Sequence, residues 1–386
     1  MSSAIVEKVK QFVKTRVIGN EKYFDSLPNP PLRAYTELQD IGVANWWIPR
    51  AYGGRGVSLE ESVDIVEELA YGDAGVAFTL FIAVIGSTAV ALFGTPEQKE
   101  RFLRPMAESG GTSATLGSER AAGSELLNIA TTARRSGDGY VISGQKFFST
   151  NAGFADHWMV IAKTPDEAAG WKAFLLQKPK AMPGVKVERR WPVIGVRASS
   201  SYQVSLQDCR VPLGAALEPN GVRVLEVGLN PSRTLIAASA IGVARRIRDL
   251  CLEYARDKTL KDGSLLHNAV FAAKIGQMEM EIEVMRSACK TAAQQFDKLA
   301  SEPEALLMAG ALKSTVVAKM ICGQLGWRIA SVGSEMFGGL GYTEDMLMGK
   351  LMRDMRYVSI VEGGDDVLRD FIYHRHVLPG VRKTGE

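Results

Sequence analysis

The stretch MRDMRYVSIVEGGDDVLRDFIYHRHVLP, Met352 to Pro379, decides how the rest of the chain is interpreted. A hydrophobic approach, Tyr357 to Val361, ends at one carboxylate, Glu362, and two glycines follow it. Asp365 and Asp366 then stand where a helix start favours acidic or capping residues. Apolar residues recur after them at helical spacing. We therefore expect Glu362 to lie in an apolar wall just before a helix N-terminus.

These surroundings suggest a chemical role for Glu362. Desolvation raises the pKa of a carboxyl group, and a carboxylate that titrates near neutral pH suits a general base. An ordinary glutamate in a loop before a helix accounts for the same residues equally well. The stretch by itself leaves both interpretations open.

Length and composition indicate a soluble globular protein of two or three packed units. The chain has 386 residues, of which 46% are hydrophobic and 23% charged. Its 46 basic and 43 acidic residues give a net charge of +3, which favours neither a nucleic-acid nor a membrane partner. The apolar run from Val76 to Phe93 is interrupted by polar residues and predicts a buried helix rather than a membrane span.

Cysteine and histidine usage points to a reduced, cytoplasmic protein without a metal site. The four cysteines are dispersed and form no CxxC pair, which indicates free thiols. No secretory signal precedes the first amphipathic segment. His374 and His376 are two residues apart, so on a helix their rings point to different faces, and we expect no metal site there.

Three segments of the chain differ in hydrophobic periodicity. Residues 1–112 are predicted to be helical, with a clear helix start at Thr95. Residues 113–218 contain short β-type runs separated by turn residues, without helices between them, which predicts an antiparallel sheet. Residues 219–386 are predicted to be helical again, with a helix start at Asn230 and broad apolar faces typical of a bundle. The expected fold class is α+β, with one continuous core.

Three further motifs combine small, hydroxyl and aromatic side chains. SATLGSERAAGSE, residues 113–125, could bring backbone amides close to a phosphate or a ring edge. KFFSTNAG, residues 146–153, joins two aromatic rings to hydroxyls that could cover a flat cofactor. FGGLGY, residues 337–342, follows a long helix. Taken singly, a connector, a core aromatic pair with a turn, and a helix C-cap explain them as well or better.

Together and in this order, the motifs resemble the acyl-CoA dehydrogenase family over nearly the whole chain. The resemblance implies an N-terminal helical domain, a middle β domain and a C-terminal four-helix bundle. It implies FAD held between the β domain and the bundle, and a homotetramer. It also implies an acyl-CoA or acyl-carrier-protein thioester as substrate, and an electron-transferring flavoprotein or another acceptor as partner.

The resemblance further implies roles for single residues. IVEGGDDVLR matches the family's motif around the catalytic base, which makes Glu362 the base, while Ser232 stands where some relatives place theirs. The implied positions are Thr115, Gly117, Ser118, Gly123, Phe148, Ser149, Thr150, Gly364 and Asp366 for FAD; Lys258, Glu335, Gly338 and Gly339 for the adenosine side of FAD, reached from another subunit; and Ser124, Asn230, Arg233 and Gly363 for the thioester or the start of its helix.

Several positions depart from the family pattern. Lys258 and the pair Lys261-Asp262 stand where the family has an arginine and a Phe-Gly pair. Glu335 replaces a glutamine and places a negative charge near the expected diphosphate, and Gly364 replaces a threonine. A lysine cannot form the bidentate fork of an arginine. These changes predict a weaker grip on the adenosine side of FAD.

The function implied is FAD-dependent α,β-dehydrogenation of an acyl-CoA to the trans-2-enoyl thioester. Glu362 would remove the α-proton, and the hydride would pass to flavin N5. One alternative is a dehydrogenase of specialised metabolism that acts on an acyl-carrier protein. Others are an oxidase or monooxygenase on the same fold, or a flavin-bearing nucleic-acid-binding relative, which the small net charge disfavours.

Overall fold

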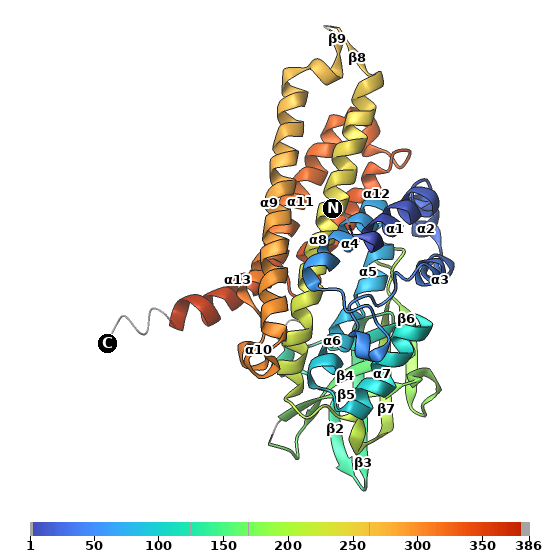
Figure 1. Cartoon of the computed structure of the whole chain (residues 1–386), viewed down its shortest axis with the longest axis vertical. Helices are drawn as coiled ribbons and strands as arrows, with labels where there is room; N and C mark the ends of the chain where they lie inside the picture. Colours follow the sequence, from blue (N-terminus) through green and yellow to red (C-terminus); the bar gives the residue numbers. More distant parts are fainter. Residues whose placement is uncertain (1–2, 124, 169, 262, 380–386) are drawn as a thin grey trace.

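The computed structural model describes residues 3–123, 125–168, 170–261 and 263–379. Long helices of the C-terminal part form the axis of the molecule, the N-terminal helices pack along one side, and the sheet lies at one end (Figure 1). The helices are α1 (Ala4–Phe12), α2 (Glu21–Ser26), α3 (Leu32–Asp40), α4 (Leu59–Gly72), α5 (Ala74–Phe81), α6 (Val84–Phe93), α7 (Pro96–Ser109), α8 (Gly221–Asp257), α9 (Ala269–Ala300), α10 (Pro303–Ala309), α11 (Lys313–Met336), α12 (Met348–Arg356) and α13 (Asp365–Ile372).

The N-terminal helices follow their sequence signals closely. The predicted start of α7 is confirmed, because the Thr95 hydroxyl accepts from the Gln98 amide at 3.2 Å and the Gln98 side chain accepts from the Thr95 amide at 2.9 Å.

The stretch Ala74–Phe93, which contains α5 and α6, is long and apolar enough to span a membrane. In this structure 72% of its most apolar window is buried against the rest of the protein, as in the core helix of a globular domain.

The middle part is a seven-stranded sheet in the order β1-β4-β2-β3-β7-β6, with β5 also paired to β4. The strands are β1 (Ser113–Leu116), β2 (Thr132–Ser136), β3 (Gly139–Thr150), β4 (His157–Thr164), β5 (Gly170–Gln177), β6 (Val185–Arg190) and β7 (Ser201–Pro212), and a short separate pair, β8 (Thr259–Leu260) and β9 (Gly263–Ser264), caps the far end of the bundle.

The sheet is mainly antiparallel, as predicted, but it also contains two parallel pairings that were not expected. β1 pairs with β4 in parallel over four residues, and β2 meets β4 in parallel at one residue, while the remaining pairs are antiparallel. A parallel pair requires a long crossover connection, usually a helix. Here the hairpin of β2 and β3 supplies that length, so no helix was needed.

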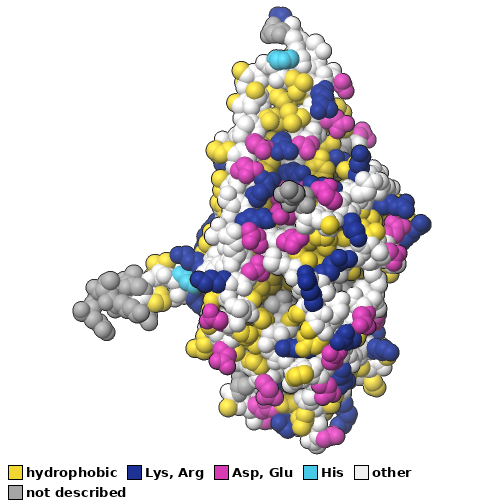
Figure 2. Space-filling view, viewed as in Figure 1, with side chains coloured by type: hydrophobic (Ala, Val, Ile, Leu, Met, Phe, Trp, Pro, Cys, Tyr) yellow, Lys and Arg dark blue, Asp and Glu magenta, His cyan; other side chains and the backbone are white. Residues whose placement is uncertain are grey.

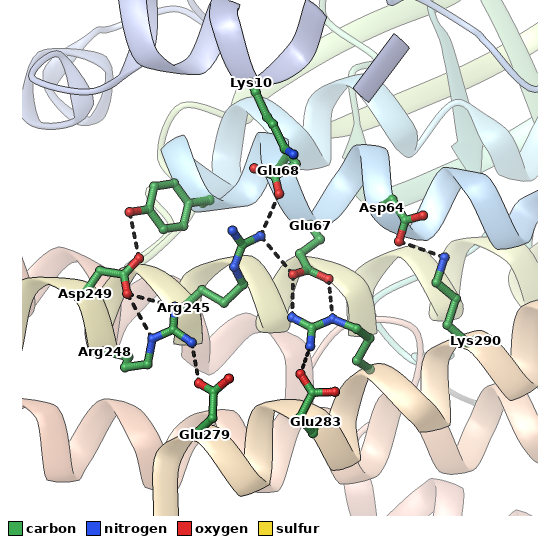
Figure 3. Close-up of polar contacts among 12 residues, drawn as sticks. Lys10, Asp64, Glu67, Glu68, Arg245, Arg248, Asp249, Glu279, Glu283 and Lys290 are labelled. Atoms are coloured by element: carbon green, nitrogen blue, oxygen red, sulfur yellow. Dashed lines mark hydrogen bonds and ion pairs between the residues drawn. The ribbon is translucent and has the colours of Figure 1, made fainter. Parts of the chain in front are cut away.

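The core is divided, contrary to the expected single core. One large cluster of buried side chains joins the N-terminal helices to the bundle, and a second cluster fills the β domain. Ion pairs reinforce the first contact, between α4 and the helices α8 and α9 (Figure 3). The buried carboxylate of Glu67 forms ion pairs with Arg245 at 2.9 Å and with Arg286 at 2.8 Å. On the face shown in Figure 2, basic and acidic side chains are interspersed.

The first bundle helix begins ten residues before the predicted start. α8 starts at Gly221, where the Asn220 side chain accepts from the Val222 and Arg223 amides at 3.0 and 3.2 Å. Asn230 lies inside the helix and is fully buried. An Asn-Pro pair is a common helix start, but here the asparagine side chain forms hydrogen bonds with residues distant in the sequence.

Those contacts fasten the turn between α10 and α11. The Asn230 amide donates to the Gly310 carbonyl at 2.9 Å, and its oxygen accepts from the Leu312 amide at 2.8 Å and the Thr315 hydroxyl at 2.9 Å. Its donor and acceptor are therefore both engaged within the fold, which corrects the expectation that Asn230 contacts the ligand or anchors a helix start.

We predict that Asn230→Ala destabilises the protein by about 2–3 kcal/mol, because it leaves buried partners unsatisfied. Chemical denaturation followed by circular dichroism measures the change. Asn20→Ala, which removes an exposed side chain that bonds one local carbonyl, is the matched control and should change stability far less. An unchanged midpoint for Asn230→Ala would contradict this assignment.

Candidate active site

Glu362 lies in a strained turn between a 3-10 turn, Tyr357–Ser359, and α13. Its φ is +54°, and the φ of Gly363 is +109°. Gly364 returns to extended backbone as the N-cap residue of α13. A non-glycine residue held in this left-handed region costs about 1–3 kcal/mol. The turn therefore needs contacts that hold it.

Three side chains from helices α8 and α11 supply those contacts. From α8, the Ser232 hydroxyl donates to Oε1 of the Glu362 carboxyl group. Arg233 donates to the Glu362 carbonyl from Nη2 at 2.9 Å and from Nε at 3.2 Å. From α11, Nζ of Lys319 donates to the Gly363 carbonyl at 2.6 Å. Arg233 and Gly363 thus serve the turn itself, whereas the resemblance implied a contact with the thioester.

The surroundings adjust the acidity of Glu362. Burial raises its pKa to about 7, while the Ser232 hydrogen bond and the charges of Arg233 and Lys319 oppose the rise. Oε2, the second carboxyl oxygen, is buried and has no hydrogen-bond partner among the described residues. One oxygen is therefore held while the other is left for a proton, which is the arrangement expected of a general base.

A buried ion pair organises the loop of residues 117–131. The Lys146 ammonium contacts Glu119 at 2.8 Å and donates to the Gly117 carbonyl at 3.1 Å. Glu119 also accepts from the Ala130 amide at 2.6 Å and the Thr131 amide at 3.1 Å. Burial alone would raise the pKa of Glu119, but Lys146 and these hydrogen bonds bring it below its ordinary value. Burial lowers the pKa of Lys146 to about 8 against the pull of Glu119.

The structure brings two of the sequence motifs together. The Phe147 amide donates to the Ser118 carbonyl at 2.9 Å, so the end of β3 lies beside the loop that follows β1. A register shift between Lys146 and Ser149 interrupts the pairing of β3 with β7. At this interruption Phe148 has a φ of +53°, and the residue is 59% exposed. It stacks on Trp191 with ring centroids 4.7 Å apart.

Some buried polar groups of the described β domain have no protein partner, and those of Ser149 and Trp191 belong to residues next to Phe148. The hydroxyls of Thr115 and Ser149 are buried and find no hydrogen-bond partner in the described part of the chain. The same holds for the indole N–H of Trp191 and the hydroxyl of Ser201, whose residue pairs with Thr150 in the sheet. Buried polar groups of this kind are normally bonded. An exposed aromatic ring beside such groups fits a flat, polar-edged cofactor.

Helix α8 connects this region to Glu362. A side chain at Gly117 would meet Leu225 on α8, and Ser232, which bonds Glu362, follows seven residues later. Seven residues are two helical turns, so both positions lie on one face of α8, about 10 Å apart. The β1 loop and the candidate base therefore lie along the same face of one helix.

The residues expected on the adenosine side of FAD lie elsewhere. Lys258 ends α8 beside the β8–β9 pair, at the end of the bundle away from the sheet (Figure 1). Glu335 is exposed near the end of α11 and pairs with Lys274 at 3.4 Å. Gly338 and Gly339 begin the turn after α11, and added side chains there would meet open space. Within one chain, these residues do not approach Phe148.

The remaining expected positions are exposed or lie outside the described residues. Asp366 is almost fully exposed and pairs with Arg369 at 2.6 Å on α13. A side chain at Gly123 would also meet open space. Ser124 lies outside the described residues. In the described ranges no group of three or more His, Cys, Asp or Glu side chains could hold a metal ion.

Sequence reasoning missed Lys146, Lys319 and the contact of Ser232. Lys146 stands in the KFFSTNAG motif, where a lysine followed by aromatic residues was a visible signal. Lys319 lies in an apolar helical stretch and carries no local signal. Ser232 is known from its place in the family pattern, but its hydrogen bond to Glu362 requires the packing of α8 against the turn.

Comparisons with known proteins agree with this architecture. Three models of acyl-CoA dehydrogenase domains match the chain: the N-terminal domain over residues 2–110, the middle domain over 114–209 and the C-terminal domain over 219–377. Cyclohex-1-ene-1-carbonyl-CoA dehydrogenase of Geobacter metallireducens is 31% identical over 336 residues, which is 85% of each chain.

Solved structures share the fold. Butyryl-CoA dehydrogenase of Megasphaera elsdenii superimposes with a TM-score of 0.86 at 26% identity, over 95% of this chain and 97% of that one. An acyl-CoA dehydrogenase of Bacillus anthracis, solved in complex with FAD, gives a TM-score of 0.88 at 23% identity, over 98% of this chain and 67% of that one. The chain therefore belongs to the acyl-CoA dehydrogenase family, whose members are flavoprotein oxidoreductases that act on CH–CH groups.

Proposed function

We propose that the protein oxidises an acyl-CoA thioester to its α,β-unsaturated product, with Glu362 as the base that removes the α-proton. The observation that carries the proposal is the state of this carboxyl group. Burial raises its pKa to about 7, Ser232 orients one oxygen, and the other oxygen has no partner within the described chain. The similarity to enzymes named for acyl-CoA substrates supports the thioester class.

The chain's own residues would position and desolvate the reacting carbon atoms. Glu362 takes the α-proton on Oε2, and its deprotonated form predominates only above about pH 7. The bonding electrons of the Cα–H bond form the new double bond as the β-hydrogen leaves with its electron pair. The apolar surroundings that raise the pKa of Glu362 also exclude water from the enolate that develops.

FAD is the cofactor that fits the β-domain side of the site. The exposed ring of Phe148 offers a flat surface, and the unpartnered groups of Thr115, Ser149 and Trp191 offer polar contacts. When bound, FAD supplies the oxidising power by accepting the hydride from the β-carbon. An electron-transferring flavoprotein or another acceptor would then reoxidise the enzyme.

The separated adenosine-side residues support an oligomer, and we propose a homotetramer. Lys258 and Glu335 lie toward the end of the bundle that is away from the sheet (Figure 1), and Phe148 lies in the sheet, so we expect them to reach the same FAD only from a second copy of the chain. α13 also leads away from the body of the molecule (Figure 1) and exposes Val367, with Tyr373 and Val377 beyond it. Exposed apolar side chains of this kind are typical of subunit contacts.

We predict that Glu362→Gln lowers the rate of flavin reduction by an acyl-CoA at least about a hundredfold, the usual lower scale for losing a positioned base. Anaerobic stopped-flow absorbance measures the rate. FAD content and folding should be unchanged, because the side chain is not expected to hold the cofactor. Glu335→Gln is the control and should keep the wild-type rate. A wild-type rate in Glu362→Gln would place the base elsewhere.

The pH dependence should report the same carboxyl group. We expect kcat/KM to fall as the pH drops below about 7, because Glu362 becomes protonated. The Ser232 hydrogen bond lowers the pKa of Glu362, so its removal in Ser232→Ala should shift the acidic limb to higher pH. Steady-state rates from pH 5.5 to 8.5 test both statements. A limb that does not move in Ser232→Ala would argue against Glu362 as the titrating group.

We further predict that FAD retention depends on assembly. Dilution that dissociates the oligomer should release FAD, measured by flavin fluorescence and by analytical ultracentrifugation on the same samples. Glu335→Gln removes a negative charge near the expected diphosphate and should tighten FAD. A strictly monomeric protein that retains its flavin would contradict the shared site.

A further inference from the structure

Lys319 is a buried lysine that has no ion-pair partner among the described residues. Its side chain is 0% exposed and ranks among the largest fully buried side chains. No carboxylate among the described residues forms an ion pair with it, and its Nζ donates a hydrogen bond to the Gly363 carbonyl at 2.6 Å. Burying an ammonium without a carboxylate partner is costly. Burial accordingly lowers the pKa of Lys319 to about 8.

The hydrogen bond to the Gly363 carbonyl explains why a lysine is buried at position 319. Two consecutive left-handed residues, Glu362 and Gly363, turn their carbonyls toward neighbouring helices. Arg233 of α8 holds the first carbonyl and Lys319 of α11 holds the second. The two cations come from different helices, so they hold the turn from two sides. A hydrogen bond from a charged donor is worth roughly twice a neutral one.

Other charged groups near the turn are few in the described chain. Arg233 and Asp365 act on Lys319, as does Glu362 itself. Arg233 and Lys319 both favour the ionised form of Glu362, and Tyr357 stands on the approach to the turn, where its hydroxyl contacts Ser239. Lys319 is therefore one of two cations that act on the carboxylate.

We propose that Lys319 is a positioning residue for the base: it holds the Glu362–Gly363 turn in its left-handed conformation and, through its charge, lowers the pH at which Glu362 becomes active. This inference rests on the proposed role of Glu362. Lys319 touches neither the carboxyl group nor the reacting atoms in this arrangement, and it acts through the backbone of the turn.

The test compares Lys319→Met with Lys313→Met, which removes an exposed lysine from the first turn of the same helix. We expect Lys319→Met to lower kcat about tenfold or more, because the base is displaced, while KM changes little. The acidic limb of the pH profile should move to higher pH, since a cation that favours ionised Glu362 is lost. Lys313→Met should match the wild type in both respects.

A second measurement does not depend on turnover. Infrared difference spectra of the holoenzyme, wild type minus Glu362→Gln, follow the protonated carboxyl band of Glu362 through its titration. The midpoint should be higher in the Lys319→Met background than in the wild type. If no thioester reduces the flavin but this midpoint moves, the proposed reaction fails and the positioning role stands. An unchanged midpoint together with an unchanged kcat would overturn the positioning role.

If Lys319→Met does not fold, Lys319→Gln is used for the same measurements. It keeps a hydrogen-bond donor without the charge and should still raise the infrared midpoint, because the charge is what favours ionised Glu362. A midpoint equal to the wild type in a folded Lys319→Gln protein would overturn the electrostatic part of the proposal. Circular dichroism and FAD content establish that each variant is folded.

Discussion

The turn at Glu362 and Gly363 is the constraint on which the candidate site depends. A glutamate in the left-handed region is unfavourable by itself, so this conformation exists only because α8 and α11 hold it with cations on two successive carbonyls. The same contacts leave one carboxyl oxygen without a partner. Burial raises the pKa of this carboxyl group, while the Ser232 hydrogen bond and the charges of Arg233 and Lys319 oppose the rise.

Helix α8 fixes the position of this turn relative to the β domain. On one face of α8, Leu225 lies near Gly117 in the loop after β1, and Ser232, two helical turns further on, bonds the carboxyl group of Glu362. The β domain presents its own prepared surface at the break in β3, where Phe148 is exposed among unpartnered polar groups. The buried pair of Lys146 and Glu119 fixes the loop that borders it. The proposed base and the proposed cofactor surface are therefore held by separate sets of contacts, and both lie along helix α8.

The residues expected on the adenosine side of FAD lie at the far end of the bundle, which is why we propose that a second copy of the chain completes the site. Lys258 lies beside the β8–β9 pair (Figure 1), and Glu335 pairs with Lys274 near the start of α9, so both are far from the sheet. Because a long helix separates the two regions, no small rearrangement could join them within a chain. If a second copy supplies these residues, as we propose, the strength of cofactor binding depends on the assembly.

Hydrophobic periodicity and local capping signals in the sequence were enough to predict the order of helical, β and helical parts and the start of α7 at Thr95. They depend on residues close in the chain, and the family motifs added Glu362 and its neighbours. The parallel pairing of β1 with β4, the role of Asn230 inside α8, and the contacts of Lys319 and Arg233 were decided only by the tertiary structure. Each of these joins segments distant in sequence, and a local pattern cannot specify which distant group satisfies a buried donor or carbonyl.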